Sequence, residues 1–296
     1  TGLLREIILA NALGASRTVD LLVLSLTLPD LLANVLFVSG FSVALVPHLR
    51  TRSQQQQAEC LSRLLARVMP IVCLIAFVGA FFADALVHLL APGLVPLTGR
   101  ESLPIQVSIL SLPLVVLSGL LVAAMMARDS FVFGGLGTAV LNSGVILGIL
   151  AGAYWVDPLV AVPLGLLGGA LARNTLHGFG AWRVGFRWSV SGVSVPVPPS
   201  LFRHIMVSAV AMSALTLAPV MLRAMASYLG EGRVTLFTLA VKMLELPLTA
   251  VFWSIGFLAL PALSSLYQTD LVAAHARLSR DLRLSVFLGL IASIVV

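Results

Sequence analysis

The sequence predicts an all-α protein that crosses a membrane several times. Hydrophobic residues make up 59% of the chain and charged residues only 10%, and the mean hydropathy is +1.06. Apolar runs of the length that crosses a bilayer, about 20 residues, recur along the whole chain. Soluble domains do not combine these features, so the chain is placed among polytopic membrane proteins.

Short polar turns divide the apolar residues into nine predicted helices. The chain begins and ends inside apolar runs, so we expect a fragment whose first and last helices are cut. The runs lie at 1–13, 20–49, 64–82, 105–126, 131–155, 159–176, 204–226 and 234–260, and from 284 onward.

The stretch 20–49 differs from a plain membrane span. Pro29 interrupts it and Asp30 follows directly. A proline removes one backbone hydrogen bond and kinks a helix, so the freed carbonyl needs a neighbour or water as its partner. A charged side chain at this depth usually faces a polar interior. Kink and acid together predict a helix that lines a polar cavity of a transporter, with Asp30 as a candidate cavity acid.

The arginines predict how the chain is oriented. With the loop after 20–49 in the cytoplasm, the inside segments hold most of them, as the positive-inside rule requires. The inside arginines are Arg50, Arg52, Arg63, Arg67, Arg128, Arg173, Arg183, Arg187, Arg203, Arg277, Arg280 and Arg283. The outside arginines are Arg17, Arg100, Arg223 and Arg233.

An internal echo predicts two related halves. Leu13-Gly14 and Leu28-Pro29 in the first half correspond to Leu229-Gly230 and Leu246-Pro247 in the second. Broken helices at matching places in two halves are typical of transporters built from repeats. We therefore expect a six-helix lobe over 1–180, a cytoplasmic linker over 181–202, and over 203–296 the beginning of a second lobe, with helices seven, eight and part of nine.

Four further charged residues are candidates for the cavity. Arg5 is either a cavity cation or an anchor whose side chain reaches the interface. Lys242 and Glu245 lie three residues apart on one helix face, and are either cavity groups or a pair that neutralises itself. Asp20 is either a ligand or an acid that interacts with a helix dipole at an N-terminus.

The sequence contains no motif of an enzyme active site. It has no phosphate-binding loop with Lys-Ser/Thr, no nucleophile elbow and no HExxH. Cys60 and Cys73 follow no metal-site or disulfide spacing. We therefore expect no catalytic activity, no cofactor and no metal. The arginines are scattered singly, so a nucleic-acid partner is not expected either.

Several segments resemble a known family. GLLREIILANALGASRTVD, LPDLLANVLFVSGFSVALVP, APGL, VLNS and KMLELP are similar to the MurJ/MviN family of lipid II flippases, within the multidrug/oligosaccharidyl-lipid/polysaccharide (MOP) exporter superfamily. The resemblance covers the whole chain and about nine of the family's fourteen helices. It implies a MATE-like bundle of two six-helix lobes, the second truncated here, around a cationic cavity. That cavity accepts the headgroup of an undecaprenyl-pyrophosphate-linked saccharide and releases it to the outer leaflet by alternating access.

The resemblance also implies roles for particular residues. Arg5 matches a cavity arginine of the first helix, and Asp20 an acid at the outer start of the second. Lys242 stands where the eighth helix usually has arginine, and Glu245 matches that helix's acid. The chain departs from the family at Ala33 and Val38, where arginine and glutamate are usual.

These departures keep other substrates open. The leading hypothesis is a lipid II flippase in the bacterial cytoplasmic membrane, whose partners are the lipid-linked precursor and membrane lipids. The alternatives are a flippase for another lipid-linked exopolysaccharide or O-antigen unit, a cation-coupled drug antiporter, and a membrane scaffold without transport. We expect a monomer and leave open its association with the cell-wall synthesis machinery.

Overall fold

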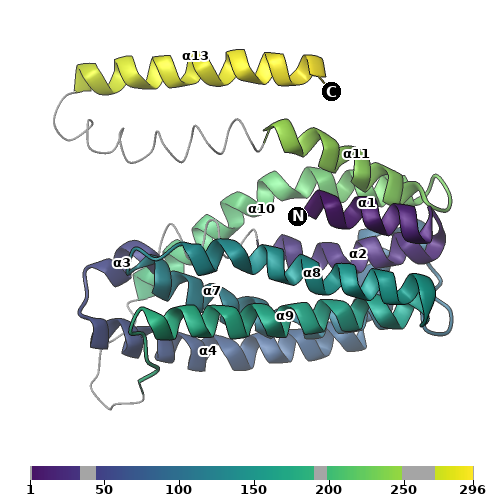
Figure 1. Ribbon diagram of the computed structural model, residues 1–296, viewed down its shortest axis with the longest axis horizontal. Helices are drawn as coiled ribbons and strands as arrows, with labels where there is room; N and C mark the ends of the chain where they lie inside the picture. The colour runs from purple at the N-terminus through teal and green to yellow at the C-terminus, as the bar shows by residue number, and fades with distance from the viewer. Residues whose placement is uncertain (1, 34–44, 190–198, 249–270, 296) are drawn as a thin grey trace. The chain divides into compact units, whose positions relative to one another are not determined.

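The computed structural model describes residues 2–33, 45–189, 199–248 and 271–295, and these ranges contain helices and no strand (Figure 1). The predicted all-α class is therefore confirmed. The chain divides into two compact units, Thr1–Leu236 and Phe237–Val296.

The helices of the first unit form one bundle. They are α1 (Gly2–Leu13), α2 (Arg17–Ala33), α3 (Val46–Arg50), α4 (Gln54–Phe81), α5 (Ala83–Leu90), the 3-10 turn η2 (Pro92–Leu94), α6 (Leu103–Leu110), α7 (Leu112–Met126), α8 (Val132–Tyr154), α9 (Pro158–Arg183) and α10 (Pro199–Ser227). Helix α11 (Arg233–Leu248) begins in the first unit, and α13 (Leu271–Val295) belongs to the second. Among the described residues, four helical segments are long and apolar enough to cross a membrane, namely α4, α6 with α7, α8, and α9.

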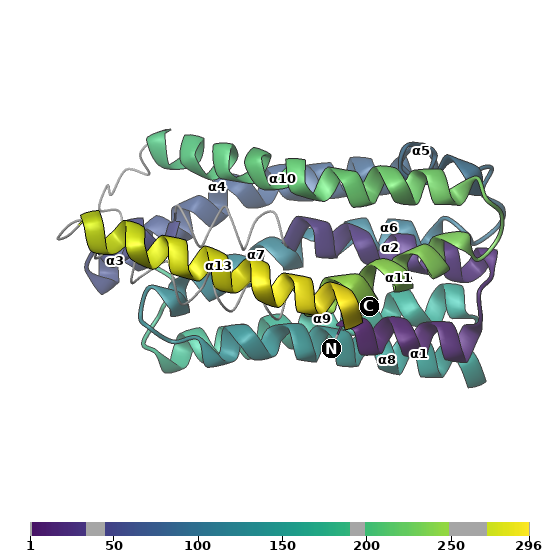
Figure 2. The same cartoon turned by 90° about the horizontal axis from the view of Figure 1, so that it is seen from above.

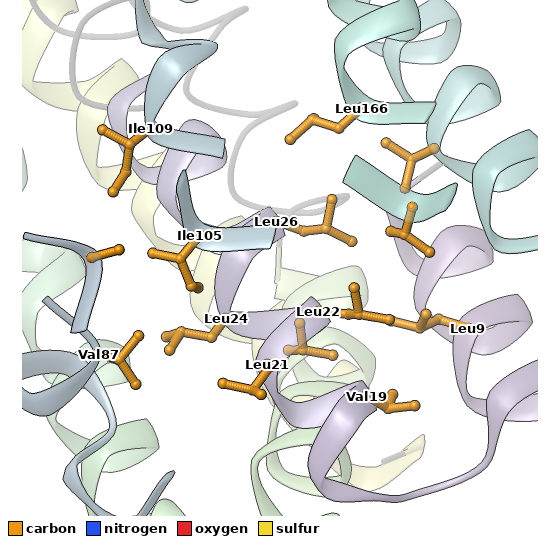
Figure 3. Close-up of a cluster of buried hydrophobic side chains, with 14 of the residues drawn as sticks. Leu9, Val19, Leu21, Leu22, Leu24, Leu26, Val87, Ile105, Ile109 and Leu166 are labelled. Carbon is orange, nitrogen blue, oxygen red and sulfur yellow. The ribbon is translucent and has the colours of Figure 1, made fainter. Parts of the chain in front are cut away.

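Helix α2 occupies the centre of the first unit. Its side chains Leu21, Leu22 and Leu26 are at most 1% exposed. A helix at the surface of a bundle buries one face only, whereas these residues lie on different sides of α2. Figure 3 shows them among residues of several other helices, including Leu9 of α1 and Ile105 of α6. Because α2 is apolar all round, it has to be enclosed by neighbours, and α1, α6, α7 and α9 pack against it.

The backbone carbonyl that Pro29 leaves without a donor in α2 has a partner on another helix. Pro29 lies inside the helix and provides no N–H for the carbonyl of Ser25. The hydroxyl of Ser108 on α6 donates a hydrogen bond to that carbonyl oxygen. The prediction that a neighbour satisfies the freed carbonyl is thus confirmed, and the contact fixes α6 against α2.

Helices α8 and α9 pack backbone to backbone, side by side in Figure 1. A Cβ atom added at Gly144 would lie 2.5 Å from the Cα atom of Gly169, and one at Gly165 would lie 2.6 Å from the carbonyl oxygen of Gly144. Only glycine permits this approach. Small residues at a helix interface allow such close contact in membrane proteins.

Helices α4 and α9 extend well beyond their predicted ranges. Ser53 and Gln56 form a capping box, so α4 begins at Gln54 and contains Arg63 and Arg67. Helix α9 continues to Arg183, and Arg173 lies inside it at 5% exposure. Arg173 therefore lies within a helix and is covered by neighbouring helices, not in a loop, and the side of the membrane to which it belongs stays a prediction.

Parts of the predicted organisation fall on residues that are not described. These include Val38 in the second half of the stretch 20–49, and residues 190–198 of the linker 181–202. The lobe boundaries stay a prediction.

Candidate functional site

Arg5 forms the centre of a charged cluster in the first unit. Its Nη2 atom lies 2.6 Å from Oε1 of Glu6 and 3.0 Å from Oδ2 of Asp30. Arg5 is 3% exposed and Glu6 5%. A buried arginine needs such hydrogen-bonded counterions, because the desolvation cost of its charge is large. The structure thus brings together two of the predicted site residues, Arg5 and Asp30, and adds Glu6, to which the sequence analysis assigned no role.

Asp30 is the more accessible member of this cluster. Its side chain is 40% exposed, and it follows the buried Pro29. Asp30 belongs to α2, whereas Arg5 and Glu6 share α1. The Arg5–Asp30 ion pair therefore connects two helices, while the Arg5–Glu6 pair lies within one. The role of these groups in substrate binding stays a prediction.

Two buried residues of α9 were missed by the sequence analysis. His177 is 2% exposed, and its Nδ1 atom lies 2.7 Å from the hydroxyl oxygen of Ser118 on α7. The Nε and Nη2 atoms of Arg173 are buried and make no hydrogen bond within the described part of the chain. Both side chains lie against Gly137 of α8. Their spacing of four residues, which places them on one helix face, is the signal that could have identified them.

Asp20 binds the start of a distant helix. Its Oδ2 atom accepts a hydrogen bond of 2.7 Å from the backbone N–H of Gly232, and its Oδ1 atom accepts bonds of 2.7 and 2.6 Å from the N–H and the hydroxyl of Thr235. These donors belong to the N-terminal end of α11, where a carboxylate also interacts favourably with the helix dipole. Asp20 thus lies in the first turn of its own helix, α2, and also at the N-terminal end of α11.

Further contacts surround this junction. The backbone N–H of Gly93 in η2 donates a 2.9 Å hydrogen bond to the Ser227 hydroxyl at the end of α10, and α5 and η2 pack beside α10 (Figure 2). Arg17 donates to Glu101 from Nε at 3.0 Å and from Nη2 at 3.2 Å. These bonds tie the start of α2 and the end of α10 to the segment between α5 and α6. We call this group, together with Asp20, the α11 junction.

Lys242 and Glu245 lie in the second unit. The Nζ atom of Lys242 is 2.7 Å from Oε2 of Glu245, and the side chains are 34% and 45% exposed. They form the pair that their spacing predicts. That Lys242 shares a cavity with Arg5 stays a prediction.

The charged groups of the site are paired both within and between elements. Arg5–Glu6 and Lys242–Glu245 pair within one helix, whereas Arg5–Asp30 joins α1 to α2. No group of three or more metal-binding side chains occurs among the described residues.

The family model described as "Lipid II flippase MurJ" matches residues 9–296. The chain belongs to this family. It is 26% identical over 289 residues to the Lipid II flippase MurJ of Burkholderia cenocepacia, an alignment that covers 89% of this chain and 54% of that protein. The chain thus spans about half the length of this relative.

A solved structure has the same fold. The structure described as "Lipid II flippase MurJ, inward closed conformation" superimposes with a TM-score of 0.78 at 16% identity. The match covers 97% of this chain and 60% of the MurJ chain. The family resemblance inferred from the sequence segments is confirmed, and so is the MurJ-type fold of a helical membrane transporter.

Proposed function

We propose that the chain forms part of a flippase that moves lipid II from the inner to the outer leaflet of the bacterial cytoplasmic membrane. Membership of the MurJ family supports the substrate, an undecaprenyl-pyrophosphate-linked saccharide. The observation that carries the proposal is Arg5, a buried guanidinium held between carboxylates of two helices. A guanidinium binds phosphate oxygens through two parallel hydrogen bonds, and does so strongly where water is excluded.

The α11 junction supports alternating access as the mechanism. Asp20 accepts three hydrogen bonds from the start of α11, so α2 and α11 cannot separate at this end without breaking them. The predicted orientation puts this end outside. Release of a headgroup to the outer leaflet then requires the junction to open, while uptake from the cytoplasm leaves it closed.

The proposal includes a multi-pass location in the cytoplasmic membrane and transport without covalent change of the substrate. Four described helical segments of spanning length and composition support the location. The drive comes from the membrane potential or an ion gradient, since the sequence contains no nucleotide-binding loop.

The test is complementation of a flippase-depleted bacterial strain with the full-length gene. The wild type restores growth and lipid II translocation, whereas Arg5→Met does not when the two proteins are compared at equal abundance in the membrane. Arg183→Met, which removes an exposed arginine at the end of α9, serves as the control and restores growth. Arg5→Met with wild-type translocation contradicts the proposal. Translocation of an O-antigen carrier in place of lipid II assigns the protein to another lipid-linked saccharide.

A further inference from the structure

Two carboxylates bind the guanidinium of Arg5 in this structure. Glu6 and Asp30 both accept from its Nη2 atom, and the Nε atom also donates to Glu6, at 3.2 Å. An anionic headgroup would meet two carboxylates around one cation. Each edge through which a guanidinium binds two phosphate oxygens includes Nη2, so Arg5 has to lose a counterion before it can bind a phosphate in this way. Glu6 lies on the same helix and moves with Arg5, so Asp30 on α2 is the counterion that can leave.

Arg173 lies where a departing Asp30 can be received. It is 5% exposed, and two of its guanidinium nitrogens have no hydrogen-bond acceptor within the described residues. A buried cation in that condition is costly, because nothing replaces the water that it has lost. Helix α9, which carries Arg173, packs against α2, which carries Asp30. The first unit thus contains a carboxylate paired with Arg5 and, on an adjacent helix, a buried guanidinium whose Nε and Nη2 atoms have no acceptor among the described residues.

Asp30 and Arg173 lie at similar distances from the same end of the bundle. Arg17 at the start of α2 pairs with Glu101, and Asp157, just before α9, lies 3.9 Å from the neighbouring Arg100. The two helices thus begin at the same end of the bundle, and they pack against each other. Asp30 is 13 residues beyond Arg17, about 20 Å along a helix. Arg173 is 15 residues beyond Pro158, about 22 Å.

We propose that Arg173 is the second partner of Asp30, and that transfer of this carboxylate from Arg5 to Arg173 releases Arg5 for the diphosphate of the substrate. The inference rests on the proposed flippase function and deepens it. Arg173 is a positioning residue in this scheme, since it acts through Asp30 and does not touch the substrate.

The exchange keeps the charges balanced. Before it, Asp30 pairs with Arg5, and Arg173 lacks an acceptor for two nitrogens; after it, Asp30 pairs with Arg173, and the diphosphate takes its place at Arg5. One charge-assisted hydrogen bond is broken and another is formed. The 40% exposure of the Asp30 side chain shows that it is not confined by close packing. Without Arg173, departure from Arg5 would leave Asp30 without a counterion.

The test measures equilibrium binding of radiolabelled farnesyl diphosphate to the full-length protein. Arg173→Met, which keeps side-chain bulk and removes the charge, weakens binding about tenfold, because the carboxylate no longer leaves Arg5 readily. Arg173→Lys retains the wild-type affinity. The decisive variant is Arg173→Met combined with Asp30→Asn. This variant has no carboxylate to displace from Arg5, so its binding recovers to the wild-type level or better. Arg183→Met on the same helix serves as the control and leaves binding unchanged.

Each outcome separates the inference from the function on which it rests. A double variant that binds as weakly as Arg173→Met overturns the inference. If Arg173 only fills space, its loss weakens binding through packing, and Asp30→Asn cannot restore that packing. Unchanged binding by Arg173→Met overturns it too, and the flippase function stands in both cases. A wild-type protein that binds no farnesyl diphosphate and translocates no lipid-linked saccharide refutes the proposed function and the inference together.

Discussion

At the level of single residues, several of the buried charges among the described residues occur in groups. Arg5 has Glu6 and Asp30, and Asp20 has three donors from α11. Removing one member of such a group costs about 3–5 kcal/mol, because its partner is left buried without compensation. These groups are therefore sensitive both to mutation and to any motion that separates their helices.

Glu101 makes the α11 junction sensitive to acid. The hydrogen bond from Arg17 is the main cause that lowers the pKa of the Glu101 carboxyl. The ionised Glu101 carboxylate stabilises the fold fully above its unfolded-state pKa of about 4.3. This stabilisation is lost as the pH falls through the lower folded-state pKa. We expect Glu101→Gln to unfold at a lower temperature than the wild type at pH 7. The difference disappears in acid below the folded-state pKa. Thermal unfolding of the full-length protein between pH 7 and 3 measures this, and a pH-independent difference contradicts it.

At the level of secondary-structure elements, the kink of α2 depends on one hydroxyl of α6. Ser108→Ala leaves the Ser25 carbonyl without its donor and lowers the free energy of unfolding by about 1–3 kcal/mol. Adding Pro29→Ala restores a backbone N–H for that carbonyl, so the double variant recovers stability. Denaturant unfolding in detergent measures both effects.

The control for this prediction is Ser143→Ala. Its hydroxyl bonds only to Ala139 of its own helix and is exposed, so its removal changes stability by less than about 0.5 kcal/mol. A double variant less stable than Ser108→Ala contradicts the assignment of the Ser108 hydroxyl to the proline site.

Helices α8 and α9 offer a matched pair of glycines. A Cβ at Gly165 would lie 2.6 Å from the Gly144 oxygen, while one at Gly168 meets nothing within 4 Å. Gly165→Ala should therefore force the helices apart and lower the unfolding temperature. Gly168→Ala should leave it equal or higher, because alanine favours a helix by about 0.8–1 kcal/mol over glycine. Equal effects of the two substitutions would show that the backbones are not in contact.

At the level of the whole molecule, Lys242 tests whether the second unit contributes to the site. Lys242→Arg in the full-length protein should preserve or improve growth of a flippase-depleted strain, because guanidinium binds phosphate in two places. Lys242→Met should abolish growth at normal abundance. If the combined variant Lys242→Met and Glu245→Gln supports normal growth, the ion pair serves only to neutralise its own charges.

The sequence alone determined the class of the protein and the places of its charges. Long apolar runs separated by polar turns are a local property, so the all-α membrane fold and most helix bounds could be predicted. The kink at Pro29 and its need for a partner also followed from backbone chemistry. Helices α4 and α9 were exceptions, since an arginine near the end of an apolar run resembles the end of a span until its neighbours are known.

Only the tertiary structure decided which charges meet. Asp20 contacts residues more than 200 positions away, and Asp30 pairs with Arg5 of another helix. Such pairings depend on the register and rotation of helices that are distant in the chain. A side chain on a helix can face any of several neighbours, and packing of the complete bundle selects one. The charged residues can be read from the sequence, whereas the pairing of Asp20 with α11 and of Asp30 with Arg5 is decided by the fold.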